Sequence, residues 1–118
     1  MEFYYHETDG DVLILAADGG LNAANAEQFV GDLERLVDTG VRRIIVDCKN
    51  LTHVSSVGLR ILLRLHKRLA MHGGDVKLAD VHSAIVTLLG ITRLNALFDI
   101  YPDVDQARLA FRPKSREG

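Results

Sequence analysis

The segment Arg43–Arg60, with the sequence RIIVDCKNLTHVSSVGLR, determines how the rest of the chain can be arranged. Residues 44–46 form an uninterrupted β-branched run, which is typical of a strand buried on both faces of a parallel sheet. Polar residues follow, and from Val57 onward apolar residues recur at the spacing of an amphipathic helix. The segment therefore predicts a strand, a short polar loop and a helix. Ser55 and Ser56 stand where the loop becomes the helix.

The rest of the chain alternates between strand and helix patterns. The other expected elements are, in order, a strand over Phe3–Thr8, a turn at Asp9-Gly10, a strand over Val12–Ala17 ending at Asp18-Gly19-Gly20, a helix from Ala26 closed by Gly40, the helix from Val57 continuing to Met71, a strand over Asp75–Ala79, a helix over Ser83–Leu89, an edge segment over Phe98–Tyr101, and a helix from Asp103 stopped by Pro113. This order predicts an α/β fold with an open, mixed sheet of four to five strands and about four helices. One domain is expected over residues 1–112, followed by a disordered polar tail over residues 113–118.

Asparagines precede the first expected helix. Asn22 or Asn25 can cap its N-terminus, and Asn25 with Gln28 approximates a capping box. The helix would bury one apolar face, made of Ala26, Phe29, Val30, Leu33, Leu36 and Val37.

Composition excludes several classes of protein. The formal net charge is −2 over 118 residues, which gives no argument for nucleic acid or an anionic membrane as partner. Cys48 is the single cysteine, so an internal disulfide and a multi-cysteine metal site are excluded, and its apolar strand predicts a buried, inert thiol. The histidines lack metal-ligand spacing, so no metal or cofactor is expected. Without a membrane-spanning run or a secretory signal, a cytoplasmic protein is expected.

Three segments resemble the STAS domain, the fold of the bacterial anti-sigma factor antagonists. Gly20–Ala26 is similar to the glycine-x-leucine-aspartate opening of that family's first helix, and Ile45–Leu51 to its strand ending in aspartate. Val54–Arg60 is similar to its aspartate-serine-serine-glycine-leucine signature and to the serine-serine-x-glycine-leucine variant. Gly90–Leu94 and Phe98 match the closing pattern. The resemblance covers about residues 12–111 and implies a single STAS-like domain.

The resemblance implies a switch. In that family a partner kinase of the histidine-kinase-like ATPase type, which is also the anti-sigma factor, phosphorylates the serine before the helix. The phosphorylated antagonist releases the kinase, and a serine phosphatase resets it. Aligned on Gly58, that serine is Ser56, with Ser55 the less favoured acceptor. Ser55 and Val57 depart from the signature, which often has aspartate and a second serine there, and Asn22 replaces an aspartate.

Each candidate residue also has a plain structural interpretation. Ser56 can be a helix cap as well as a phosphorylation site, and Asp47 can turn a loop rather than belong to a site at the end of its strand. Arg60 and Arg64 lie on one basic stripe with Lys67, which is either a solvated face or a contact surface. The expected partner-binding residues are Asn22, Asp47, Ser55, Ser56, Val57, Gly58, Arg60 and Arg64.

Other functions remain open. A non-switching STAS subunit could dock on a larger assembly, such as a lipid-transport ABC ATPase or a stressosome-like scaffold. A small hydrolase would need His53 to act as a base for Ser56, but no orienting carboxylate or oxyanion site accompanies it. The chain is therefore expected not to be an enzyme and not to contact nucleic acid or a membrane.

Overall fold

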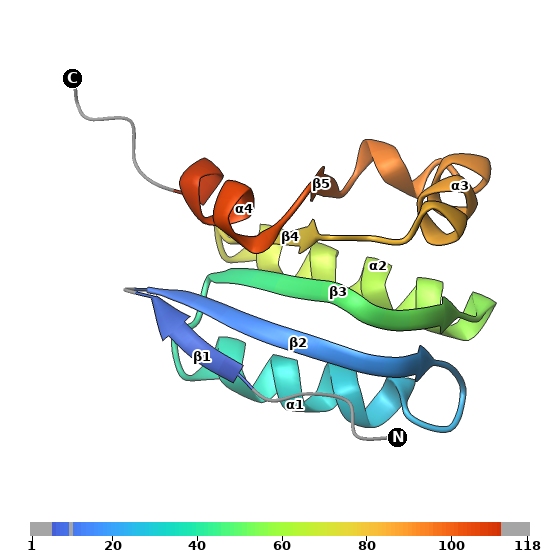
Figure 1. Ribbon diagram of the computed structural model, residues 1–118. Helices are drawn as coiled ribbons and strands as arrows, with labels where there is room; N and C mark the ends of the chain where they lie inside the picture. The colour runs from blue at the N-terminus through green and yellow to red at the C-terminus, as the bar shows by residue number, and fades with distance from the viewer. Residues whose placement is uncertain (1–5, 10, 112–118) are drawn as a thin grey trace.

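Among the residues that the structure describes, the sheet has five strands in the order β1-β2-β3-β4-β5; β1 is antiparallel to β2, and the other neighbouring pairs are parallel. The computed structural model describes residues 6–9 and 11–111 (Figure 1). Its elements are β1 His6–Asp9, β2 Val12–Leu21, α1 Ala26–Asp38, β3 Arg43–Val54, α2 Ser56–Met71, β4 Asp75–Ala79, α3 Ser83–Ile91, the 3-10 turn Leu94–Ala96, β5 Asp99–Tyr101 and α4 Val104–Phe111. The expected α/β architecture is confirmed.

The two faces of the sheet are covered by different helices. Leucines, isoleucines and valines of α1, α2 and α3 pack with alternate strand residues, including Ile44 and Val46, into one large apolar cluster. The residue between these two, Ile45, points to the opposite face and joins a smaller cluster under α4. Figure 1 shows α4 on its own, on the other side of the strands from α1 and α2. Alternation along a buried strand thus supplies both cores.

Two strands are longer than the sequence pattern predicts. The glycine pair of residues 19–20 does not end β2, which continues to Leu21. The mostly polar residues 47–53 are not a loop, because β3 runs on to Val54. The two extensions pair with each other in parallel as far as Leu21 and Val54, with irregularities in register on the way. Each extension therefore satisfies the other's backbone hydrogen bonds, which local propensity does not reveal.

The helix boundaries mostly agree with the sequence. Gly40 follows α1 with φ of +111°, the left-handed conformation expected of a closing glycine. Asp103 caps α4, since its Oδ1 accepts a hydrogen bond of 2.8 Å from the Gln106 amide. α3 continues past the predicted end to Ile91. Residues 3–5 of the expected first strand, Gly10 of the expected turn and the expected tail over 113–118 lie outside the described residues.

The described helices are short or amphipathic. Across residues 6–9 and 11–111, no helix combines the length and the apolar character that crossing a membrane requires.

Candidate functional site

Adjacent serines at the start of α2 have different surroundings. Ser55 is the N-cap residue, and its Oγ accepts a hydrogen bond of 3.1 Å from the Gly58 amide. Its own amide donates to the Leu21 carbonyl at 2.9 Å, which ties the cap to the end of β2. Ser56 is the first helical residue, and its side chain is exposed. The cap is therefore Ser55, and the Ser56 hydroxyl is open to solvent.

Gly58 keeps this helix start against the sheet. A Cβ at this position would lie 2.7 Å from the Leu21 carbonyl oxygen and 3.0 Å from a methyl carbon of Val54. Only a residue without a side chain allows α2 to begin so close to the paired ends of β2 and β3. The Leu21 carbonyl is thus part of the site, although the sequence did not predict it. The glycine of the signature, Gly58, was the residue that could have indicated such a close approach.

The loop between β2 and α1 lies beside the cap, because Leu21 pairs with Val54. Asn25 occupies the N-cap position of α1 but makes no side-chain capping bond. Its Oδ1 accepts from the Asn22 amide at 3.0 Å and its Nδ2 donates to the Gly20 carbonyl at 2.8 Å, while the Asn22 side chain accepts from the Ala24 amide. Asn25 thus takes the predicted N-cap position, but the predicted side-chain capping bond and capping box are absent. The two asparagine side chains instead hold the loop that borders Ser55.

Asp47 does not belong to this group. It lies in the middle of β3, opposite Ala16 and Ala79, and β3 continues for seven more residues to Val54. That is roughly 23 Å of strand. Its position at the carboxyl end of the strand was a wrong prediction, caused by the unrecognised strand extension. The Asp47 Oδ1 accepts from the Lys49 amide at 3.1 Å, which is the local role.

The predicted basic residues of α2 divide into two kinds. Arg64 reaches across to α1, with its guanidinium 3.4 Å from Glu27 and 3.3 Å from Glu34. Arg60 is exposed one helical turn after Ser56, and no carboxylate in the described part of the chain pairs with it. Arg60 is therefore available to a partner near Ser56, whereas Arg64 already has an interhelical role.

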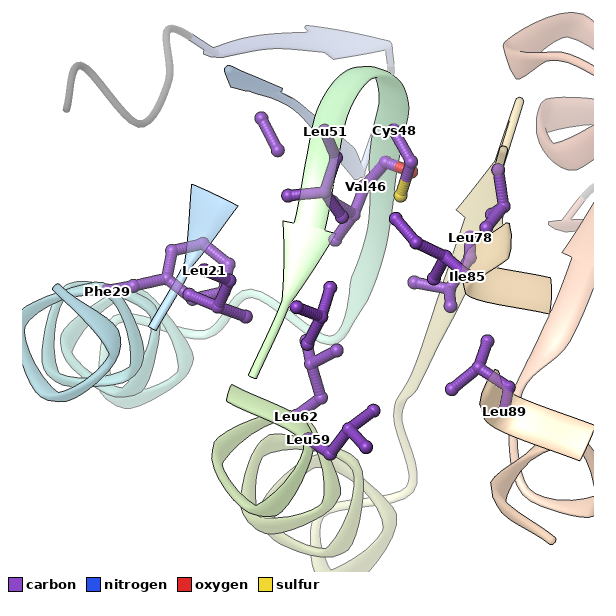
Figure 2. A pocket seen from close by; sticks show the side chains of 13 residues that line it. Leu21, Phe29, Val46, Cys48, Leu51, Leu59, Leu62, Leu78, Ile85 and Leu89 are labelled. Carbon is purple, nitrogen blue, oxygen red and sulfur yellow. The ribbon is translucent and has the colours of Figure 1, made fainter. Parts of the chain in front are cut away.

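The space beneath α2 is apolar and almost filled. Figure 2 shows Leu59 and Leu62 of α2 pointing toward the sheet residues Val46 and Cys48. The enclosed cavity measures about 10 Å³, close to the smallest volume that holds one water molecule. Burial, and then the neighbouring Asp47 carboxylate, raise the pKa of Cys48 to about 12, so its thiol stays protonated. The prediction of a buried, inert thiol is confirmed.

The geometry favours a surface that another protein can cover. The described residues group no three His, Cys, Asp or Glu side chains in a metal-binding arrangement. His53 lies over Gly20, where a Cβ would be 2.8 Å from its Nδ1. What the site offers is an exposed hydroxyl at a helix N-terminus, where unpaired amides and partial positive charge favour an added anion.

Comparison with known proteins identifies similar chains. A family profile described as the STAS domain matches residues 5–107. The "putative anti-sigma factor antagonist BtrV" of Bordetella bronchiseptica is 31% identical over 112 residues, which cover 95% of this chain and 96% of that protein. A solved "putative anti-sigma factor antagonist" from Thermotoga maritima has a TM-score of 0.88 at 22% identity, covering 93% and 95% of the two chains. The Bacillus cell fate determinant SpoIIAA, solved in its phosphorylated form, has a TM-score of 0.74 at 16% identity, covering 92% and 99%.

Proposed function

Because the chain belongs to the STAS domain family, among its anti-sigma factor antagonists, we propose that it binds an anti-sigma factor and that phosphorylation of Ser56 ends this binding. The observation that carries the proposal is that Ser55, and not Ser56, caps α2. Ser55 makes the capping bond, so Ser56 can be modified without loss of the cap. The chain supplies the acceptor hydroxyl and performs no catalysis itself.

The proposed acceptor site tolerates the product. A phosphoserine carries about −1.5 to −2 charges at neutral pH. The first turn of α2 contains no acidic residue to oppose it, and Arg60 follows one turn later. A helix N-terminus accommodates such an anion, so the domain stays folded.

A bound partner would respond differently. Burying the phosphate in an interface, or placing it against like charge, costs several kcal/mol. The contact surface of the proposal is the start of α2 with the adjoining loop: Asn22, Ser55, Ser56, Val57, Gly58 and Arg60. The partner is a cytoplasmic serine kinase of the histidine-kinase-like ATPase type, which is also the anti-sigma factor, and a serine phosphatase reverses the modification. Neither nucleic acid nor a membrane takes part directly.

The test is phosphorylation by the kinase of the same pathway. Incubation with kinase and ATP is expected to add one phosphate, which peptide mass spectrometry locates on Ser56. Ser56→Ala abolishes the modification, whereas the matched variant Ser55→Ala retains it. In binding assays the Ser56→Asp variant is expected not to bind the kinase, whereas Ser56→Ala is expected to bind it. Retention by both Ser56 variants would favour the rival function, a constitutive docking subunit, for which the absence of the family aspartate at Ser55 leaves room.

A further inference from the structure

A groove of about 390 Å³ runs along the outer side of α2, beginning one turn after Ser56. Its walls combine cations, the carboxylate of Glu34 and two apolar side chains, Leu63 and Met71. Met71 is 80% exposed, although it is a large apolar residue at the end of a helix whose other face is buried. Single exposed apolar residues are ordinary, but methionine and arginine, which this groove combines, are enriched at protein–protein interfaces.

The cations of the groove differ in whether they form ion pairs with carboxylates of this chain. Arg64 is held by the acidic residues of α1 described above, and Arg68 pairs with Asp38 at 2.8 Å. Arg60 and Lys67 are exposed and have no ion-pair partner within residues 6–9 and 11–111. They lie seven residues apart on one helical stripe, which places them roughly 10 Å apart along the axis. Within the part of the chain that the structure describes, the groove thus presents two positive charges without an ion-pair partner, at a defined spacing.

From this arrangement we infer that the groove docks an acidic amphipathic helix of the same anti-sigma factor that binds at Ser56. Carboxylates at i and i+7 of that helix match the spacing of Arg60 and Lys67, and an apolar side chain beside them covers Leu63 and Met71. This contact rests on the proposed function for the identity of the partner. It adds a second contact with the anti-sigma factor, which does not involve the Ser56 hydroxyl or a phosphate on it.

One partner can reach both positions. Ser56, Arg60 and Lys67 are spaced i, i+4 and i+11, so they share one face of α2. The distance from Ser56 to Met71 is about 22 Å along the helix. An ordinary interface of roughly 800 Å² per partner is wide enough to span that length.

The surroundings disfavour other anionic partners. Membrane-surface helices need a broad apolar face, whereas α2 buries its apolar face in the core and leaves Met71 as its large exposed apolar residue. Glu27, Glu34 and Asp38 of α1 already neutralise Arg64 and Arg68, so α2 lacks the continuous row of free cations that the closely spaced phosphates of nucleic acid require. A separate pair of carboxylates on a protein avoids both problems.

The experiment measures binding of the full chain to the purified anti-sigma factor. The double variant Lys67→Glu, Met71→Ser lies far from Ser56 and is expected to weaken Kd about tenfold, since it reverses one charge and removes the apolar anchor. Lys49→Glu, an equal charge change on β3, is the matched control and should change Kd less than twofold. Urea unfolding establishes that each variant is folded.

The outcomes separate the two proposals. If the double variant binds like Lys49→Glu while Ser56→Asp loses binding, the groove inference is overturned and the switch stands. If the double variant weakens binding while Ser56→Asp retains it, the groove stands and the switch fails. Binding of the unaltered chain, but not the double variant, to phosphatidylglycerol vesicles would assign the groove to a membrane and overturn the inference. A self-association that the double variant abolishes would assign it to a second copy, with the same consequence.

Discussion

The two faces of the sheet are held by different kinds of interaction. The face under α1, α2 and α3 is packed with apolar side chains and carries Ser56 at its edge. The face under α4 is smaller, and its distinctive residue is Lys77, which is 6% exposed. The Lys77 Nζ lies 3.0 Å from Asp75, 2.9 Å from Asp99 and 4.6 Å from the ring centroid of Phe111.

The proposed binding site therefore lies on the first face, whereas the second face mainly stabilises the fold. On the first face the site depends on how closely backbone and apolar groups approach, as at Gly58 and the Leu21 carbonyl. On the second face the side chain of Lys77, from β4, lies under α4 and donates hydrogen bonds to Asp75 of β4 and Asp99 of the edge strand β5. The ion pair with Asp99 links the two strands. Changes on one face should therefore leave the other largely unaffected, which substitutions on each face can test.

The largest effect is expected from Gly58→Ala. The new Cβ would lie 2.7 Å from a backbone oxygen that cannot rotate away, so α2 must shift from the sheet. A loss of about 1–3 kcal/mol in the free energy of unfolding is expected, together with weaker binding to the anti-sigma factor. Urea unfolding and a binding assay measure the two.

Gly90→Ala is the matched control for that substitution. Gly90 is also helical, on α3, but among the described residues a Cβ added to it would meet no atom within 4 Å beyond its chain neighbours and the backbone of its own helix. Removing glycine from an exposed helix should stabilise the protein by about 0.5–1 kcal/mol. A similar stability change in both alanine variants would show that close approach does not constrain Gly58.

A smaller effect should distinguish the adjacent serines. Ser55→Ala removes the capping bond to the Gly58 amide and should lower the free energy of unfolding by about 1 kcal/mol. Ser56→Ala removes an exposed hydroxyl that is not the cap and should change it by less than about 0.5 kcal/mol. Thermal unfolding of the two variants at neutral pH provides the comparison, and equal losses would contradict the assignment of the cap.

The smallest effect is expected from Lys77→Met on the other face. Because Asp75 and Asp99 are substantially exposed, the loss at neutral pH should be about 1 kcal/mol or less, with binding to the anti-sigma factor unchanged. Burial alone lowers the pKa of Lys77, but its hydrogen bonds to Asp99 and Asp75 outweigh burial and raise it above the ordinary value. A raised lysine pKa contributes stability that is complete below the unfolded-state value, about 10.4, and is lost as the pH rises through the folded-state value.

The pH dependence provides the check on Lys77. The difference in unfolding free energy between the natural chain and Lys77→Met should be constant up to about pH 10 and shrink at higher pH. A difference that grew with pH in that window would mean that the ion pairs do not stabilise the protein.

Much of the fold could be predicted because it depends on local periodicity. The β-branched run at residues 44–46 and the apolar stripes of α1 and α2 appear in the structure as strand and buried helix faces. The prediction failed where pairing between distant segments overrides local character. The glycines before Leu21 and the polar residues before Val54 become strands because they pair with each other, and this moved Asp47 away from the site.

The sequence by itself determined the α/β order, the place of the serines at a helix start and the glycine that follows them, since these depend on periodicity, capping chemistry and the missing Cβ. Tertiary structure decided which serine is the cap, because the end of β2 supplies the carbonyl that orients Ser55. It also decided which cations of α2 form ion pairs, because the acidic residues that pair with Arg64 belong to α1. Both outcomes depend on groups 30 or more residues away in the chain, whose approach no local pattern encodes.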